Sequence, residues 1–246
     1  MYRFFVEQEN IIGEEIVITG TDVNHIKNVL RIDIGEEITI SAGTDKEYIC
    51  SVTDMDNDKV VCRILDIVGN SAELSTQVVL FQGYPKGDKM ELIIQKMVEL
   101  GVTKIVPVMT KRSIVKLDDK KASKKVERFN AIALAAAKQS KRGIIPTVES
   151  VMSYKQAIEY AKTLDMNIIP YEDAKGIEYS KEIITSIKGK KSLGIFIGPE
   201  GGFSVEEVDM AKSIDAKVIT LGHRILRTET AGMAIMSIIM FQLEED

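Results

Sequence analysis

The sequence of 246 residues contains only two cysteines, two histidines and no tryptophan. A structural zinc site needs about four well-spaced ligands, so no metal is predicted. Cys50 and Cys62 lie in strand-like segments, which favours small apolar core positions over a disulfide bond. The sequence also lacks a G-x-S-x-G turn, a P-loop lysine motif and a G-x-G-x-x-G fingerprint. Metal, acyl-enzyme and NAD chemistry therefore have little support.

Long apolar runs are missing as well. Residues 1–7 contain no apolar stretch after a basic one, so no secretory signal is apparent. The longest uncharged run near the end, Thr230–Leu243, is too short to span a bilayer. With 28% charged and 45% hydrophobic residues, the chain is expected to be a globular cytoplasmic protein without a membrane partner.

Charge is distributed unevenly along the chain. The net charge is −5, yet residues 111–142 carry eleven basic and three acidic side chains. Because fields are screened beyond roughly 10 Å in salt, this local excess matters more to a phosphate backbone than the net charge. The segment predicts phosphate binding, and a solvated lysine-rich helix face is the alternative.

The first 70 residues are divided into short segments of alternating or β-branched residues. A single helix interrupts them, with Thr21 or Asp22 as its cap and Val23, Ile26 and Leu30 on its inner side. This pattern is typical of a small β-barrel. The predicted strands are Arg3–Val6, Glu15–Thr19, Glu37–Ser41, Tyr48–Thr53 and Lys59–Leu65.

Strands alternate with helices from about residue 72 onward, which predicts a parallel sheet covered by helices. The predicted domains are therefore residues 1–71 and 72–246. The expected strands are 77–82, 104–109, 167–171, 193–197 and 216–220. The expected helices are about 88–100, 121–140, 153–163, 176–186, 204–213 and 228–243.

Two glycine-bearing stretches, Ile197–Ser204 and Leu221–Ala231, each follow a predicted strand and run into a helix. Loops at the carboxyl ends of strands line the ligand crevice of an open α/β sheet. Ser204 and Glu207 fit a capping box at the start of the next helix. Glu200 disfavours a phosphate at that helix end and favours a ligand with a cationic or neutral polar portion.

The motifs in these two stretches, IGPEGGF and LGxRILRxETA, resemble those of the ribosomal RNA small subunit methyltransferase E family in the SPOUT superfamily. Further matches follow in the same order along nearly the whole chain. They are His25-Ile26-x-x-Val29-Leu30-Arg31, Lys86-Gly87-Asp88-Lys89-Met90-Glu91, Gln95-Lys96-x-x-Glu99-Leu100-Gly101 and Ala137-Lys138-Gln139-Ser140-x-Arg142.

The resemblance implies an α/β fold, in which a small PUA-like RNA-binding β-barrel precedes a SPOUT-type parallel sheet with a trefoil knot. General topology rules alone argue against a knot. The family acts as homodimers and transfers a methyl group from S-adenosylmethionine to N3 of a uridine in small-subunit (16S) ribosomal RNA. The expected partners are this RNA or the assembled small ribosomal subunit, and a second copy of the chain.

The resemblance also implies roles for individual residues. Arg227 is the expected stabiliser of negative charge on the uridine, and its alternative role is a salt bridge to Glu229 or to the partner subunit. Either Glu229 or a water molecule is expected to take the proton from uridine N3. Glu200 is expected to offset the sulfonium charge or bind the ribose. The implied cofactor-binding residues are Tyr171, Glu172, Ile197, Gly198, Pro199, Glu200, Gly201, Gly202, Leu221, Gly222, Ile225, Leu226, Thr230 and Ala231. The implied RNA-binding residues are Arg3, His25, Arg31, Lys86, Lys89, Arg112, Gln139, Ser140 and Arg142.

Two alternative functions stay open at this point. One is a related SPOUT enzyme that methylates a ribose 2′-hydroxyl of transfer or ribosomal RNA. The other is a non-catalytic RNA-binding protein that assists ribosome assembly. The intact Gly198–Gly202 loop argues against the second alternative.

Overall fold

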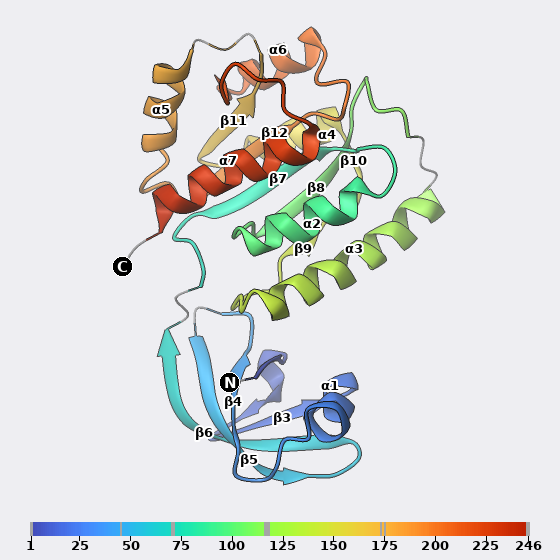
Figure 1. Cartoon of the computed structure of the whole chain (residues 1–246), viewed down its shortest axis with the longest axis vertical. Coiled ribbons are helices and arrows are strands. Elements are labelled where there is room, and N and C mark those ends of the chain that lie inside the picture. Colours follow the sequence, from blue (N-terminus) through green and yellow to red (C-terminus); the bar gives the residue numbers. More distant parts are fainter. Residues whose placement is uncertain are drawn as a thin grey trace. The chain divides into compact units, whose positions relative to one another are not determined.

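The computed structural model describes residues 2–44, 46–69, 72–115, 119–172, 174 and 176–244. The chain divides into two compact units (Figure 1). The N-terminal unit comprises Met1–Glu73 and Ala137–Ile145, and the C-terminal unit comprises Leu74–Ala136 and Pro146–Asp246. The sequence predicts a single domain boundary after residue 71. In the structure, a nine-residue segment from the middle of the chain, Ala137–Ile145, also belongs to the first unit.

The N-terminal unit is built on a mostly antiparallel sheet with the strand order β1-β4-β5-β6-β3-β2. Alternation along β3 turns Ile16 and Ile18 inward, as expected for a strand with one buried face. Register shifts between β5 and β6, one of them at Ile49/Cys50, help the sheet to curl around its core. The strands are β1 (Arg3–Phe5), β2 (Ile11–Ile12), β3 (Glu15–Thr19), β4 (Glu37–Ser41), β5 (Lys46–Met55) and β6 (Lys59–Gly69).

Cys50 and Cys62 are free and fully buried in the core of this sheet, beside residues such as Phe4 and Ile38. Burial raises the pKa of the Cys50 thiol to about 11 and that of Cys62 to about 12. Both thiols are therefore neutral core groups at physiological pH, which confirms the prediction from their positions.

One short helical segment lies between β3 and β4. The helix α1 (Thr21–Asn24) runs into the π-helical segment η2 (His25–Leu30). Val23 and Ile26 are buried and Leu30 packs against the same core, which confirms the predicted inner face. The predicted cap is wrong: Gly20 precedes the helix with a φ of 73°, no side chain caps it, and Thr21 is already helical.

The C-terminal unit contains a parallel sheet whose main path has the order β10-β8-β7-β12-β11-β13, with β9 paired to β8. Every residue of β7 after the first is buried, as expected for a strand covered on both faces. The strands are β7 (Gln77–Gly83), β8 (Lys104–Met109), β9 (Thr147–Val148), β10 (Met152–Ser153), β11 (Met166–Pro170), β12 (Ser192–Ile197) and β13 (Lys217–Ile219). The predicted strands are confirmed; β9 and β10 were not foreseen, because two residues show no periodicity.

Six helices predicted for this part of the sequence are confirmed, with ends that differ by at most two residues. They are α2 (Lys89–Glu99), α3 (Asp119–Gln139), α4 (Tyr154–Ala161), α5 (Ile177–Thr185), α6 (Val205–Ser213) and α7 (Thr228–Leu243). Among the described residues, no helix has both the length and the hydropathy needed to cross a membrane. The trefoil knot stays a prediction, because strand order defines neighbours and not threading.

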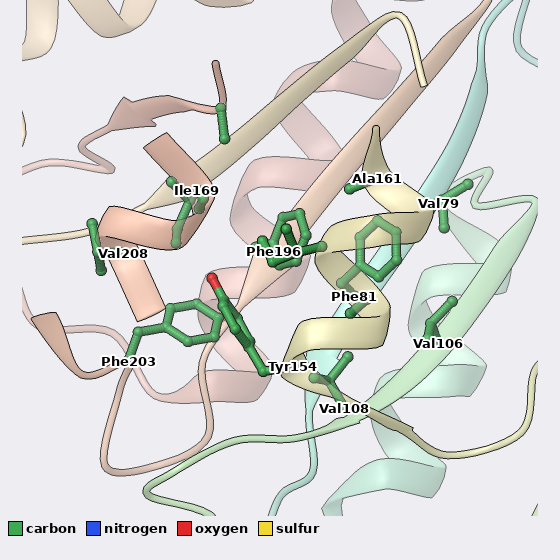
Figure 2. Close-up of a cluster of buried hydrophobic side chains, with 14 residues drawn as sticks. Val79, Phe81, Val106, Val108, Tyr154, Ala161, Ile169, Phe196, Phe203 and Val208 are labelled. Carbon is green, nitrogen blue, oxygen red and sulfur yellow. The ribbon is translucent and has the colours of Figure 1, made fainter. Parts of the chain in front are cut away.

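An aromatic cluster fills one face of the parallel sheet (Figure 2). Phe81 of β7 and Phe196 of β12 stack with ring centroids 4.5 Å apart. Tyr154 of α4 packs against both Phe196 and Phe203, and its hydroxyl donates a 2.8 Å hydrogen bond to the Glu207 carbonyl. Burial raises the pKa of Tyr154. The cluster fixes Phe203, at the start of α6, to the sheet and to α4.

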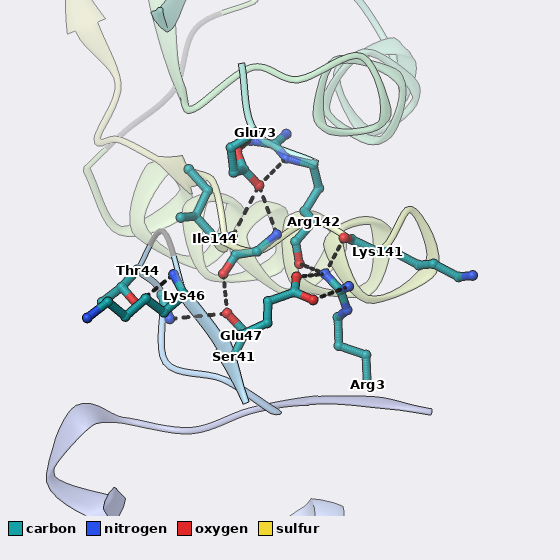
Figure 3. A network of polar contacts seen from close by, with 11 residues as sticks. Arg3, Ser41, Thr44, Lys46, Glu47, Glu73, Lys141, Arg142 and Ile144 are labelled. Atoms are coloured by element: carbon teal, nitrogen blue, oxygen red, sulfur yellow. Dashed lines mark hydrogen bonds and ion pairs between the residues drawn. The ribbon is translucent and has the colours of Figure 1, made fainter. Parts of the chain in front are cut away.

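A polar network holds the 137–145 segment within the N-terminal unit (Figure 3). The Glu73 carboxylate accepts hydrogen bonds from the Arg142 guanidinium at 2.6 and 2.8 Å and from the backbone N–H groups of Gly143 and Ile144. Arg3 donates to the Glu47 carboxylate and to the carbonyls of Lys141 and Arg142. The Arg142 side chain is only 2% exposed, so its charge depends on Glu73.

We expect Glu73→Ala to destabilise the protein by about 3–5 kcal/mol, because it leaves the buried Arg142 charge without its carboxylate. Urea unfolding followed by circular dichroism measures the loss. Glu159→Ala is the matched control, since the Glu159–Lys162 pair is exposed and worth at most about 1 kcal/mol. Equal effects of the two substitutions would contradict a structural role of Glu73.

Candidate functional site

Three loops leave the carboxyl ends of β11, β12 and β13 and enclose a cavity of about 880 Å³ within the C-terminal unit. In the part of the chain that the structure describes, they comprise residues 171, 172, 174 and 176, residues 198–204 and residues 220–227. Parallel strands bring their carboxyl ends to one edge of the sheet, which is where ligands bind in open α/β folds. The predicted crevice therefore exists at the predicted edge.

The middle loop is a tight turn built on glycines. Gly202 has a φ of +66°, which favours glycine, and its N–H donates to the Pro199 carbonyl at 2.8 Å. A Cβ on Gly198 would lie 3.0 Å from Gly202 Cα, and one on Gly201 would lie 3.2 Å from Arg112 Cβ. Side chains at these positions would therefore crowd the turn.

The start of α6 closes this loop with the predicted capping box. Ser204 Oγ accepts from the Glu207 N–H, and Glu207 accepts from the Ser204 N–H at 2.8 Å. The second oxygen of Glu207 accepts from the Lys111 N–H at 2.7 Å. The carboxylate thus ties the end of the loop to the chain that follows β8.

The negative charge of Glu200 is balanced by the groups around it. Lys89 Nζ lies 2.9 Å from its carboxylate, and the Lys86 N–H donates to both of its oxygens at 3.2 and 3.3 Å. Burial acts to raise the pKa of Glu200, but the hydrogen bonds from Lys89 and from the Lys86 backbone outweigh it and hold the pKa below its ordinary value. Lys89 therefore offsets part of the negative charge that Glu200 presents to a cationic ligand.

Lys89 also reaches a second carboxylate. Its Nζ lies 3.4 Å from Glu229 Oε2, in the first turn of α7. Glu229 is half-buried and does not line the cavity, whereas Arg227 does. Arg227 is exposed and, among the residues that the structure describes, takes part in no ion pair. The salt bridge between Arg227 and Glu229, considered from the sequence, is not formed.

The cavity gathers nearly all the residues expected to bind the cofactor. Thr230 alone does not line it; this residue is exposed on α7. Leu221 and Leu226 are partly buried in the wall, whereas Ile225 is 94% exposed. Lining residues that were not singled out from the sequence are Pro170, Ala174, Gly176, Ile177, Phe203, Thr220, His223, Arg224 and Thr228.

Two family models match the chain. Residues 72–240 match an RNA methyltransferase domain, and residues 18–65 match an RNA methyltransferase PUA domain. A Bacillus subtilis protein named ribosomal RNA small subunit methyltransferase E is 39% identical over 99% of this chain and 98% of its own length. The chain belongs to the ribosomal RNA small subunit methyltransferase E family.

Other members agree with this assignment. A Mesomycoplasma hyopneumoniae protein of the same name is 34% identical over 96% of this chain and 98% of its own length. The crystal structure of a ribosomal RNA small subunit methyltransferase E from Neisseria gonorrhoeae, bound to S-adenosyl methionine, is similar with a TM-score of 0.82. It is 30% identical and covers 98% of this chain and 97% of its own. The family and SPOUT-type fold predicted from the motifs are confirmed.

The residues expected to bind RNA have different surroundings in this methyltransferase E family chain. Lys89 and Arg112 line the cavity, and Arg112 donates to the Gly201 carbonyl at 2.8 Å. Arg142 is buried against Glu73, and Arg3 is paired with Glu47. The remaining five residues are also at least partly exposed, and they are His25, Arg31, Lys86, Gln139 and Ser140. A direct RNA contact by Arg142 would require its ion pair to break.

In the part of the chain that the structure describes, no three or more His, Cys, Asp or Glu side chains form a group that could hold a metal ion. The groups in or beside the cavity are backbone groups, Arg227, Lys89 and the nearby carboxylates Glu200 and Glu229.

We expect Lys89→Met to raise the pKa of Glu200, because burial then acts without the opposing ammonium group. The lowered pKa of Glu200 in the parent contributes stability above its ordinary pKa of about 4.3, which is lost as the pH falls through the folded value. Urea unfolding at a series of pH values should therefore show that the variant loses less stability than the parent as the pH falls from above the ordinary glutamate pKa to below the lowered pKa of Glu200.

Lys162→Met is the control, because it removes an exposed lysine paired with Glu159. A carbon-detected NMR titration of the Glu200 carboxyl reads the pKa directly. An unchanged Glu200 pKa in Lys89→Met would contradict the electrostatic role of Lys89.

Proposed function

We propose that this chain transfers a methyl group from S-adenosylmethionine to N3 of a uridine in small-subunit (16S) ribosomal RNA, as a homodimer. The observation that carries the proposal is the cavity, which the two family motifs line within an RNA methyltransferase domain. The naming of the relatives and the ligand in the Neisseria gonorrhoeae structure support the same reaction.

The residues of the cavity fit this cofactor. Its volume of about 880 Å³ lies within the usual range for ligand pockets, roughly 300–1,000 Å³. Leu221, Leu226 and Ile197 provide an apolar wall for an adenine ring, and the glycines of the middle loop leave backbone groups open to close approach. When bound, S-adenosylmethionine supplies a methyl group carried on a positively charged sulfur.

Arg227 is the residue best placed to assist the reaction. Loss of the proton from uridine N3 leaves negative charge on the neighbouring carbonyl oxygens, and a cation aimed at them stabilises that charge. Arg227 is exposed at the cavity, permanently protonated and without an ion pair among the described residues. Glu229 is paired with Lys89 and does not line the cavity. We therefore assign removal of the uridine N3 proton to a water molecule and give Glu229 a supporting role.

The N-terminal half of α3 is a suitable contact for the RNA backbone. Lys120, Lys124 and Arg128 follow at spacings of four residues and are exposed on neighbouring turns, although Arg128 also pairs with Glu91 at 2.8 Å. Lys120 lies in the first turn of α3, where a cation opposes the helix dipole, so helix stability does not account for it. Phosphate attraction does account for it.

Two exposed apolar side chains on α7 support the homodimer. The sequence predicts that this helix, apolar on nearly every side, is buried. In the structure Ile235 and Met236 are buried, while Ile238 is 46% and Phe241 84% exposed. A second copy related by a twofold axis would cover them.

The decisive experiment mixes the purified protein with radiolabelled S-adenosylmethionine and either 16S RNA or assembled small subunits. Mass spectrometry then locates the methyl group. A methyl group on uridine N3 supports the proposal. A methyl group on a ribose 2′-oxygen would contradict it and favour the alternative, an enzyme that methylates the ribose 2′-hydroxyl. Cofactor-independent RNA binding without transfer to either substrate would indicate an assembly factor.

We expect Arg227→Ala to lower kcat by about 10²- to 10³-fold, the usual effect of removing one donor that stabilises developing charge. Cofactor affinity should change little, because the side chain acts on the uridine. Single-turnover methyl transfer and calorimetry separate the two quantities. Lys212→Ala, a substitution of an exposed residue on α6, is the control. A fall in cofactor affinity without a fall in kcat would contradict the role assigned to Arg227.

We expect Phe241→Glu to convert the dimer into monomers, since it places a charge in an apolar contact. Sedimentation velocity at micromolar concentration reads the change. Val205→Glu is matched in chemistry, because Val205 is an exposed apolar residue on α6. Dissociation by both variants, or by neither, would argue against α7 as the dimer contact.

A further inference from the structure

A buried hydrogen-bonded chain connects the sheet to two of the three cavity loops. Gln82, near the end of β7, is fully buried and lies opposite Ile197 in the register with β12. Its side-chain amide donates to Thr228 Oγ1 at 2.8 Å and to the Gly83 carbonyl at 3.0 Å. Thr228, the first residue of α7, donates in turn to the Gly198 carbonyl at 2.6 Å.

The direction of these hydrogen bonds is determined by chemistry. The Gln82 amide nitrogen can only donate, so the Thr228 hydroxyl accepts there and has one proton left for Gly198. Gln82 Oε1 is buried with no hydrogen-bond partner among the described residues. A buried amide with an unsatisfied oxygen is unfavourable for stability. Its neighbours at this face of β7, Val78 and Leu80, are apolar.

Packing against Gly83 also restrains the peptide bond between Gly198 and Pro199. A Cβ on Gly83 would lie 2.5 Å from Pro199 Cδ and 2.9 Å from the Gly198 carbonyl carbon. Pro199 has no N–H, so the Gly198 carbonyl is the only hydrogen-bonding group of the Gly198–Pro199 peptide. Contact with Gly83 and the Thr228 bond together define its orientation.

We propose that Thr228 and Gln82 are positioning residues for the methyl donor site. Thr228 joins the loop 198–204 to the loop 220–227, whose last residue is Arg227, and Gln82 fastens Thr228 to the central strand of the sheet. The pair sets the shape of the cavity and the point from which Arg227 extends. The donor part of the proposal rests on the proposed function.

The test compares Thr228→Val, which keeps the side-chain shape and removes the hydroxyl, with Thr228→Ser, which keeps the hydroxyl. We expect Thr228→Val to weaken binding of S-adenosylhomocysteine by about tenfold, as for loss of a buried hydrogen bond, and Thr228→Ser to bind within about twofold of the parent. Thr185→Val is the matched control, since the exposed Thr185 hydroxyl bonds only to the Lys181 carbonyl of its own helix.

A second readout needs no ligand. Amide hydrogen exchange of residues 198–204 should accelerate in Thr228→Val and stay at the parent rate in Thr228→Ser and Thr185→Val. Gln82→Met should have a smaller effect, because the Thr228 hydroxyl can still donate to Gly198. Adding Gln82→Met to Thr228→Val should then cause little further change, as expected for residues that act through one contact.

The outcomes separate this proposal from the function on which it rests. If the folded parent binds neither S-adenosylmethionine nor its demethylated product, the proposed function fails and the exchange experiment still tests the positioning of the loop. If the parent binds but Thr228→Val matches it in affinity and exchange, the positioning role alone is overturned. Equal defects in Thr228→Val and Thr228→Ser would also overturn it, because side-chain shape rather than the hydroxyl would then be decisive.

Discussion

Close contact between Gly83 and the Gly198–Pro199 peptide is the constraint on which the cavity depends. β7 and β12 pair in the middle of the sheet, so the loop that leaves β12 begins directly beside the end of β7. With a side chain at residue 83 the peptide could not lie there. The loop must therefore turn at once, and Gly202 with its positive φ allows it to do so before α6 begins.

Both ends of this loop are held by groups far away in the sequence. Phe203 enters the aromatic cluster with Tyr154, and Glu207 binds the Lys111 N–H. At the other end, Thr228 binds the Gly198 carbonyl. The glycines give the loop its path, and these contacts prevent it from sampling others. A site that must align reacting groups benefits from such a preorganised backbone.

The charged side chains around the cavity differ in whether they form ion pairs. Lys89 joins Glu200 and Glu229, so two carboxylates share one ammonium group. Arg227 lines the same cavity and remains exposed. Counting charges in the sequence does not distinguish these cases, as Arg142 also illustrates. It belongs to the basic segment 111–142, yet it is buried as a structural partner of Glu73.

The sequence by itself determined the longer helices and strands, the family and most of the cavity lining. Periodicity reports which face of a helix or strand is apolar, and the glycine motifs report where the backbone turns at strand ends; both are local properties. Tertiary structure alone decided that Thr228 and Gln82 meet, that residues 137–145 join the N-terminal unit and that Lys89 bridges two carboxylates. These contacts join residues 69 to 146 positions apart in the sequence. No local pattern encodes such pairs, because they arise only when folding brings the ends of separate strands and helices together.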